Sequence, residues 1–128
     1  HIHIVGCSPR SGTTLMQEMM VACFSIDHHC AHERSLFLEE PGKAGITCTK
    51  QPREVIYAEI ALRINPDLHV IYITRDPRDV VVSRHAKQPD KYFVSASFYL
   101  RAERCAGRLL NHPRFIVVRY EDLVCAPD

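Results

Sequence analysis

A cluster of hydroxyl, guanidinium and glycine residues near the start of the chain has the composition of an anion-binding loop. Arg10 supplies a fixed positive charge and Gly12 supplies flexible backbone. Hydroxyl donors stand beside them at Ser11, Thr13 and Thr14. If such a loop runs into a helix, free backbone N–H groups and the positive end of the helix dipole also favour a bound anion. The plainer alternative is an ordinary strand–loop–helix connection.

The residues around this loop predict the strand and the helix that it needs. An apolar run at residues 2–5 suits a short buried strand. Apolar residues then recur at helical spacing after the loop: Leu15, Met16, Met19, Met20 and Cys23. The loop is not a Walker A loop, because Thr13 follows Gly12 where that motif has lysine. It does not match the G-x-G-x-x-G turn either.

A second set of anion-binding residue types begins at Arg75, directly after the clearest apolar run of the chain, residues 68–74. Asp76 can cap a helix and Pro77 suits its first turn. Arg75 is therefore expected at a strand end, and Ser83, eight positions later, about two turns into the following helix. A guanidinium fork and a hydroxyl can bracket a terminal phosphate. The alternative is a basic, capped helix start without a ligand.

Two further segments offer a general base and a cation. His32 and Glu33 place an imidazole beside a carboxylate, and both groups are common general bases. Lys50 follows a short strand pattern and precedes Pro52, which places it at a strand end facing a crevice. Taken alone, Glu33 fits a solvated carboxylate at a helix start, and Lys50 fits an exposed surface lysine.

Together these motifs resemble those of sulfotransferases that use 3′-phosphoadenosine 5′-phosphosulfate (PAPS). The run Pro9-Arg10-Ser11-Gly12-Thr13-Thr14 is similar to their 5′-phosphosulfate loop, and its extension into Leu15-Met16 resembles the tyrosylprotein and bacterial branches. The pattern from Arg75 to Ser83 is similar to their 3′-phosphate signature, Arg-Asn/Asp-Pro-x-Asp-x-x-x-Ser. The run Tyr120-Glu121-Asp122-Leu123, with Pro127 soon after, resembles a third landmark of these sulfotransferases.

The resemblance implies a role for each candidate residue. Glu33 would be the catalytic base, since residues 30–33 lie where tyrosylprotein sulfotransferases carry Cys-Gly-Glu-Glu. His32 stands in place of the first Glu and is a rival base. Arg10 and Lys50 would stabilise charge on the sulfuryl oxygens and the leaving phosphate. The loop residues that would hold the 5′-phosphosulfate are Pro9, Arg10, Ser11, Gly12, Thr13 and Thr14, and the rest of the nucleotide would contact Arg75, Ser83 and Tyr120.

The implied reaction moves a sulfuryl group from PAPS to a hydroxyl or amine of a small-molecule, glycan or peptide acceptor and releases 3′-phosphoadenosine 5′-phosphate (PAP). A sulfuryl group carries less negative charge than a phosphoryl group, so no metal is expected to be required. Two rivals remain: a kinase of the P-loop fold, which would need ATP and magnesium, and a non-catalytic PAP-binding domain. A zinc site within residues 25–33 is disfavoured, because the His, Cys and acidic residues there are too densely spaced.

Alternating strand and helix patterns predict an α/β fold. Strands are expected at residues 2–5, 46–49, 68–74 and 115–118, and helices over 13–23, 53–64, 77–83 and 91–111. This order predicts a parallel sheet covered by helices on both faces, and the resemblance implies a P-loop-kinase-like sulfotransferase fold. The inner stripe of the last helix is assigned to Tyr92, Ala96, Tyr99, Leu100, Ala106 and Leu110. Ligand residues then follow strand ends: Arg10, Lys50, Arg75 and Tyr120.

The totals favour one globular domain spanning residues 1–128, expected to lack the C-terminal part of the family's fold. A net charge of +1 leaves no excess for binding nucleic acid, so any anion site depends on local placement of Arg and Lys. Six cysteines without a C-x-x-C pair are expected to be reduced thiols, with one or two disulfides as the alternative that an even count permits. No run has transmembrane length and no signal peptide is visible, which favours the cytoplasm, or the Golgi lumen if an anchor has been removed.

Overall fold

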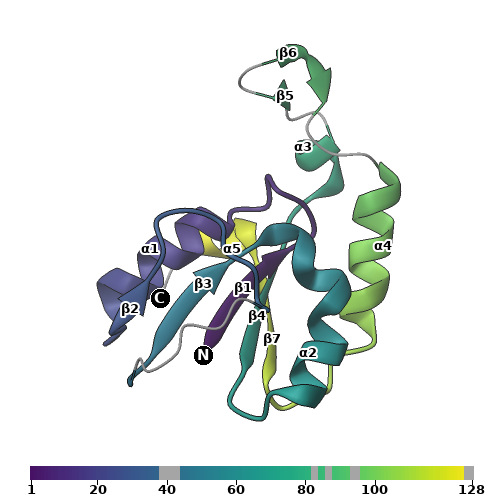
Figure 1. Ribbon diagram of the computed structural model, residues 1–128. Coiled ribbons are helices and arrows are strands. Elements are labelled where there is room, and N and C mark those ends of the chain that lie inside the picture. The colour runs from purple at the N-terminus through teal and green to yellow at the C-terminus, as the bar shows by residue number, and fades with distance from the viewer. Residues whose placement is uncertain (38–43, 82–83, 86–87, 93–95, 126–128) are drawn as a thin grey trace.

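The computed structural model describes residues 1–37, 44–81, 84–85, 88–92 and 96–125. A five-stranded sheet lies at its centre, with strand order β2-β3-β1-β4-β7 (Figure 1). In that order the strands are His28–His29, Thr47–Lys50, Ile2–Gly6, His69–Thr74 and Phe115–Arg119. Every pairing in the sheet is parallel, so the carboxyl ends of the strands meet at one edge, the upper edge in Figure 1.

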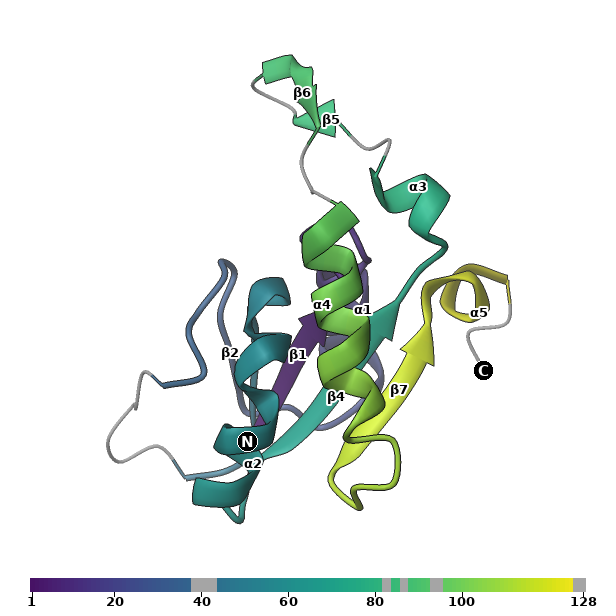
Figure 2. The same cartoon turned by 90° about the vertical axis from the view of Figure 1, so that its right-hand side faces the viewer.

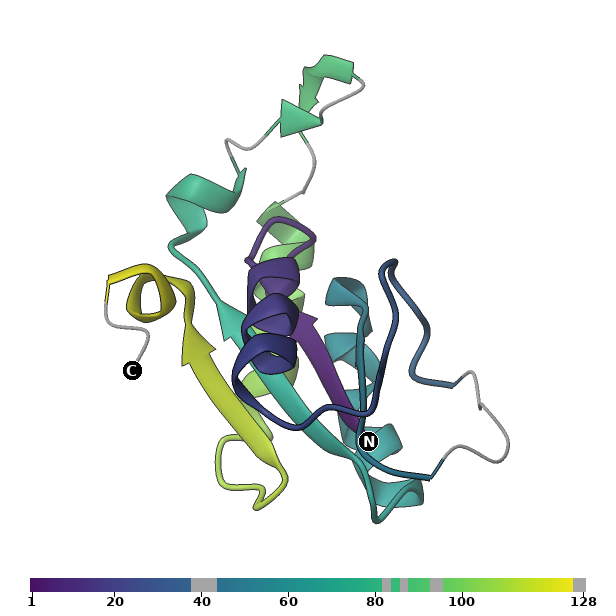
Figure 3. The same cartoon turned by 90° about the vertical axis from the view of Figure 1, so that its left-hand side faces the viewer.

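Helices cover both faces of this sheet. One face carries the 3₁₀ helix η1 (Pro52–Tyr57), α2 (Ala58–Ile64) and α4 (Ala96–Gly107), as Figure 2 shows. The opposite face carries α1 (Thr13–Cys23), with α5 (Tyr120–Cys125) beside it (Figure 3). The short helix α3 (Pro77–Val81) follows β4 at the upper edge. The predicted α/β fold with a covered parallel sheet is therefore confirmed.

Alternation along the central strands supplies two separate cores. Val5 and Tyr72 point toward the face that carries η1, α2 and α4. Ile4, Ile71 and Ile73 point toward α1 and α5. Because both faces are covered, β4 is apolar on both sides between its end residues, and β1 is apolar on both sides except at the buried His3.

Two predicted helices differ from the observed ones. The segment predicted as helix 53–64 begins as the 3₁₀ helix η1, and regular α-helix starts only at Ala58. The helix predicted over 91–111 is wrong at its start, since α4 spans Ala96–Gly107 and β6 (Gln88–Tyr92) pairs antiparallel with β5 (Arg84–His85). Strand pairing between neighbouring segments outweighed the apolar spacing that continued across residue 92.

The predicted inner stripe of α4 was also partly wrong. Leu100 and Leu110 are exposed, whereas Ala102, Ala106 and Leu109 are buried in the core that residues of η1, α2 and the sheet share. The small alanines allow α4 to pack closely on η1.

Two short elements escaped the sequence prediction. The strand β2 has only His28–His29, and the β5–β6 hairpin extends beyond α3 at the top of Figure 1. Strands of two residues show no measurable period. Among the described helices, none combines the length and apolarity needed to cross a membrane. All six cysteines are free thiols in this structure.

Candidate functional site at the carboxyl edge of the sheet

The loop between β1 and α1 is held in shape by hydrogen bonds around Ser8. The Ser8 carbonyl accepts from the Ser11 hydroxyl at 2.7 Å and from the Ser11 N–H at 3.3 Å. The Ser8 Oγ accepts from the Arg10 N–H at 3.2 Å. Ser8 and Ser11 are both fully buried. The Ser11 hydroxyl is therefore directed into the loop, where it stabilises the turn.

Gly12 ends the loop and begins α1. Its φ of 102° and ψ of 20° lie in the left-handed region that glycine adopts at little cost. A Cβ at this position would overlap the ring of Tyr120. Within the part of the chain that the structure describes, no side chain caps α1, so the N–H groups of its first turn are available to an anion.

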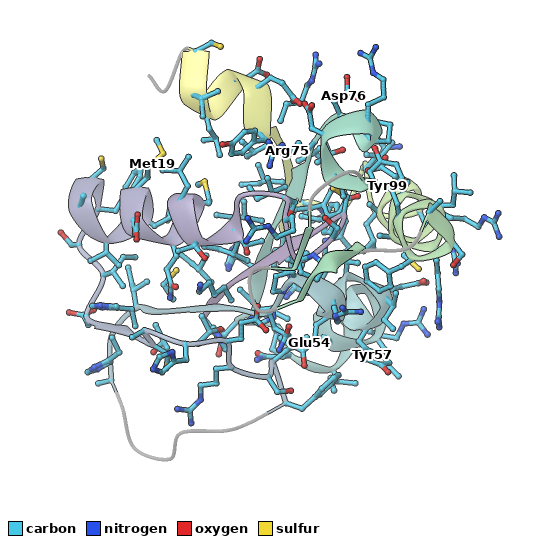
Figure 4. The ribbon with its side chains drawn as sticks, turned by 90° about the horizontal axis from the view of Figure 1, so that it is seen from above. Met19, Glu54, Tyr57, Arg75, Asp76 and Tyr99 are labelled. Carbon is cyan, nitrogen blue, oxygen red and sulfur yellow. The ribbon has the colours of Figure 1, made fainter. Side chains whose placement is uncertain are left out.

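Arg75 lies directly beside this loop, just after the end of β4 (Figure 4). Its Nη1 donates a hydrogen bond of 3.0 Å to the carbonyl of Arg10. Its guanidinium carbon lies 4.3 Å from the centroid of the Tyr120 ring. Its Nε is buried and has no hydrogen-bond partner among the described residues. A buried, unsatisfied donor on a fixed cation is a suitable contact for an anionic ligand.

Neighbouring helices fix the turn that carries Arg75. The Tyr99 hydroxyl of α4 donates to the Arg75 carbonyl at 3.1 Å. Glu121 Oε1 of α5 accepts from the Asp76 N–H at 2.8 Å, which holds the pKa of the Glu121 carboxyl below its usual range. Hydrogen bonds from Arg78 lower the pKa of Asp76 to about 2, so Asp76 stays ionised. The backbone beyond β4 is thus tied to both α4 and α5.

Lys50 approaches the loop from the opposite side. It ends β3, is only 7% exposed, and its Nζ lies 2.6 Å from the Thr14 Oγ1. The reading of Lys50 as an exposed surface lysine is therefore wrong. Among the residues that the structure describes, no carboxylate pairs with this ammonium. A buried ammonium bonded to one hydroxyl is suited to meet a negative charge at the start of α1.

The segment that carries the predicted base lies next to the end of β3. The Arg34 N–H donates to the Lys50 carbonyl at 2.9 Å, so Glu33 stands one residue from a backbone contact with Lys50. Both His32 and Glu33 have exposed side chains. The Gln17 amide of α1 donates to the Cys30 carbonyl at 3.1 Å and so secures the start of the segment.

The structure therefore joins most of the predicted residues at one edge. A series of direct contacts joins Arg10 to Arg75, Arg75 to Tyr120, and Tyr120 to Gly12. Lys50 and Thr14 form a second contact at the same helix start. The remaining predicted phosphate ligand, Ser83, lies outside the described residues.

Sequence reasoning missed several residues that support these side chains. Gln17 lies on α1 between apolar residues, and Glu54 follows Pro52 in a helix pattern. Glu103 of α4 accepts hydrogen bonds from the hydroxyls of Tyr72 and Thr74 and so ties β4 to α4. In the sequence, these residues stand out only as polar side chains within helix patterns. That they face the interior could be recognised only once the structure showed which face of each helix is buried. No metal-binding group of three or more side chains occurs among the described residues.

Comparison with known families fits this arrangement. The family model described as "Sulfotransferase family" matches residues 28–128, which is most of the chain. The chain therefore belongs to the sulfotransferase family, and this membership supports sulfuryl transfer to an acceptor as its general chemistry. The match includes Arg75 and Tyr120, while the loop at residues 9–14 lies before it. No curated protein matches the chain.

Proposed function

We propose that this protein transfers a sulfuryl group from PAPS to a hydroxyl group of an acceptor and releases PAP. The observation that carries the proposal is the placement of Arg75. Its guanidinium packs on Tyr120, bonds the carbonyl of Arg10 and keeps a buried Nε without a partner among the described residues. These contacts hold a fixed cation beside the loop at residues 9–14, and they support Arg75 as the residue that binds the 3′-phosphate.

The residues present fit a nucleotide with phosphates at both ends. The open N–H groups at the start of α1, with Lys50 and Arg10, suit the 5′-phosphosulfate. Arg75 suits the 3′-phosphate, and the pattern in the sequence adds Ser83 to it. Tyr120 would keep the guanidinium in place and line the nucleotide site.

The chemistry divides between a base and a set of cations. Glu33 takes the proton of the acceptor hydroxyl as its oxygen forms a bond to sulfur. PAPS supplies the sulfuryl group, and the bond that breaks joins that sulfur to the bridging oxygen, which leaves with its electron pair on PAP. Lys50 and Arg10 stabilise the charge that accumulates on the sulfuryl and phosphate oxygens. His32 is the alternative proton acceptor, because it adjoins Glu33 and is also exposed.

The test is calorimetric titration of the protein with PAP, 5′-AMP and ATP–magnesium. PAP should bind most tightly, because 5′-AMP lacks the 3′-phosphate that Arg75 is expected to contact. Arg75→Ala should weaken PAP binding by roughly tenfold to a hundredfold, the value of a charge-assisted hydrogen bond, and leave 5′-AMP binding nearly unchanged. Arg63→Ala on the exposed face of α2 is the matched control. Equal losses for PAP and 5′-AMP, or a preference for ATP–magnesium, would contradict the proposal.

A further inference from the structure

A second group of buried polar side chains lies on the other side of β1 from α1, around Glu54 of η1 (labelled in Figure 4). Glu54 Oε1 accepts a hydrogen bond from the Ser35 hydroxyl at 2.6 Å. Glu54 Oε2 accepts from the Leu36 N–H at 2.7 Å. Each carboxylate oxygen therefore holds one donor of the same short segment, and the two contacts fix both its position and its orientation.

The Glu54 carboxylate also contacts a residue of the sheet. Glu54 Oε2 lies 3.0 Å from Nε2 of His3, a fully buried residue at the middle of β1. His3 Nδ1 lies 2.7 Å from the Thr49 Oγ1 of β3, and this hydroxyl lies 2.6 Å from His1 Nε2. Burial would raise the pKa of Glu54, but His3, Ser35 and the Leu36 N–H together hold it below its usual range. Glu54 is thus an ionised group beside His3 of β1, and His3 links it to Thr49 of β3.

The segment that Glu54 holds is the one that carries Glu33. Gln17 secures its start at the Cys30 carbonyl, and the Arg34 N–H bonds the Lys50 carbonyl in its middle. Glu54 secures its far end at Ser35 and Leu36. Glu33 itself has an exposed side chain, so its location depends on these backbone attachments.

We propose that Glu54 is a positioning residue, which fixes the Glu33 segment beside Lys50 through its paired contacts with Ser35 and Leu36. The proposal rests on the proposed function, because it assigns Glu33 the task of removing the acceptor proton. Proton transfer requires heavy atoms within hydrogen-bond reach, and a displacement of about 1 Å can cost about a hundredfold in rate. Glu54 touches neither substrate nor nucleotide in this scheme and acts only through the segment.

The first experiment compares Glu54→Gln with the matched control Glu59→Gln. Glutamine keeps the size of Glu54 but replaces one acceptor oxygen by an N–H₂ group, which faces a donor. Glu59 is exposed on α2 and pairs only with arginines at 3.4 and 3.6 Å among the described residues. Glu54→Gln should lower kcat about tenfold or more, with KM for PAPS and the Kd of PAP within about twofold of wild type. Glu59→Gln should leave all three values unchanged.

The second measurement is native-state amide hydrogen exchange over residues 30–37, which needs no turnover. Glu54→Gln should speed exchange at Arg34 and Leu36 by about tenfold, since the one remaining acceptor oxygen cannot accept from both Ser35 and Leu36 and the segment loosens. Ser35→Ala removes one of the same bonds from the other side, and should show a smaller change in the same direction. The double variant should lose less than the sum of the two single losses, because both act on one contact.

Each outcome decides a separate point. Unchanged exchange in Glu54→Gln, unchanged kcat despite faster exchange, or equal losses in kcat and PAP affinity would each overturn the positioning role. If the wild-type protein transfers no sulfuryl group, or Glu33→Gln retains full activity, the proposed function fails instead. In that case exchange still shows whether Glu54 holds the segment, and the catalytic part of the proposal is overturned.

Discussion

The guanidinium carbon of Arg75 lies 4.3 Å from the centroid of the Tyr120 ring, so a cation at the end of β4 is packed on the first residue of α5. The same ring contacts the backbone of Gly12, where a Cβ would overlap it. Tyr120 therefore links the loop at Gly12 to the turn that follows β4. A cation–π contact of this kind contributes about 0.5–1 kcal/mol when exposed and about 2 kcal/mol when desolvated.

Removing the Tyr120 ring should weaken nucleotide binding while removing its hydroxyl should not. Tyr120→Leu is expected to raise the Kd of PAP by about threefold to thirtyfold, corresponding to the loss of a cation–π contact. Tyr120→Phe keeps the ring face and should stay within about twofold of wild type. Isothermal titration with PAP measures both. A large loss in Tyr120→Phe would mean that the hydroxyl, rather than the ring, contacts the ligand.

Gly12→Ala should destabilise the fold for two separable reasons. An alanine at φ 102° is strained by about 1–2 kcal/mol, and its methyl group would also overlap the Tyr120 ring. In a Tyr120→Ala background the overlap disappears, so the cost of Gly12→Ala should fall to the backbone part alone. Chemical denaturation measures these free energies of unfolding.

Gly107→Ala supplies the control for that comparison. A Cβ at Gly107 would meet no atom within 4 Å, and its φ is not positive. Alanine should therefore be neutral or stabilise α4 by about 0.4–1 kcal/mol. An equal loss of stability at both glycines would contradict the assigned role of the loop geometry.

The parts of this site that the sequence could predict are those defined by local pattern. The strand–loop–helix at residues 2–23 and the strand before Arg75 follow from apolar spacing, so the structure confirmed them. Contacts between distant segments could not be predicted, because no local pattern pairs Lys50 with Thr14 or Glu54 with Ser35. The predicted start of α4 was wrong because the apolar spacing continues through residue 92. Residues 88–92 instead form β6, which depends on pairing with β5, and such pairing is not visible in the local pattern.

The base can be assigned by comparing Glu33→Gln with His32→Gln. If Glu33 removes the acceptor proton, Glu33→Gln should lower kcat by about a hundredfold or more, while the Kd of PAP stays close to wild type. His32→Gln should then retain most activity. Steady-state kinetics with PAPS and a surrogate hydroxyl acceptor measures the difference. Retained turnover in Glu33→Gln with loss in His32→Gln would transfer the role to His32.

The six thiols should react in an order set by burial. Burial raises the pKa of both Cys7 and Cys48 to about 11, so little thiolate forms there at pH 8. Cys23 and Cys125 are exposed and should react first with a chromogenic disulfide reagent, with Cys30 and Cys105 intermediate. Under denaturing conditions all six should react at once. Fast modification of Cys7 in the native protein would mean that the loop opens readily.

Stability should fall in acid partly because of Glu54. Its pKa in the folded protein is below the ordinary value of 4.5, so its ionised form is favoured by folding. That contribution is fully present above pH 4.5 and is lost as the pH falls through the lower folded pKa.

Glu54→Gln should remove this contribution, so the difference in the free energy of unfolding between wild type and variant should shrink as the pH is lowered below the folded pKa of Glu54. Asp76 and Glu121 also have lowered pKa values, but they remain in the variant and cancel in the difference. Thermal unfolding of wild type, Glu54→Gln and Glu59→Gln from pH 7 to pH 3 measures this difference. If the stability of wild type and of Glu54→Gln changes with pH in parallel, the contacts of Glu54 with His3, Ser35 and Leu36 do not stabilise its ionised form.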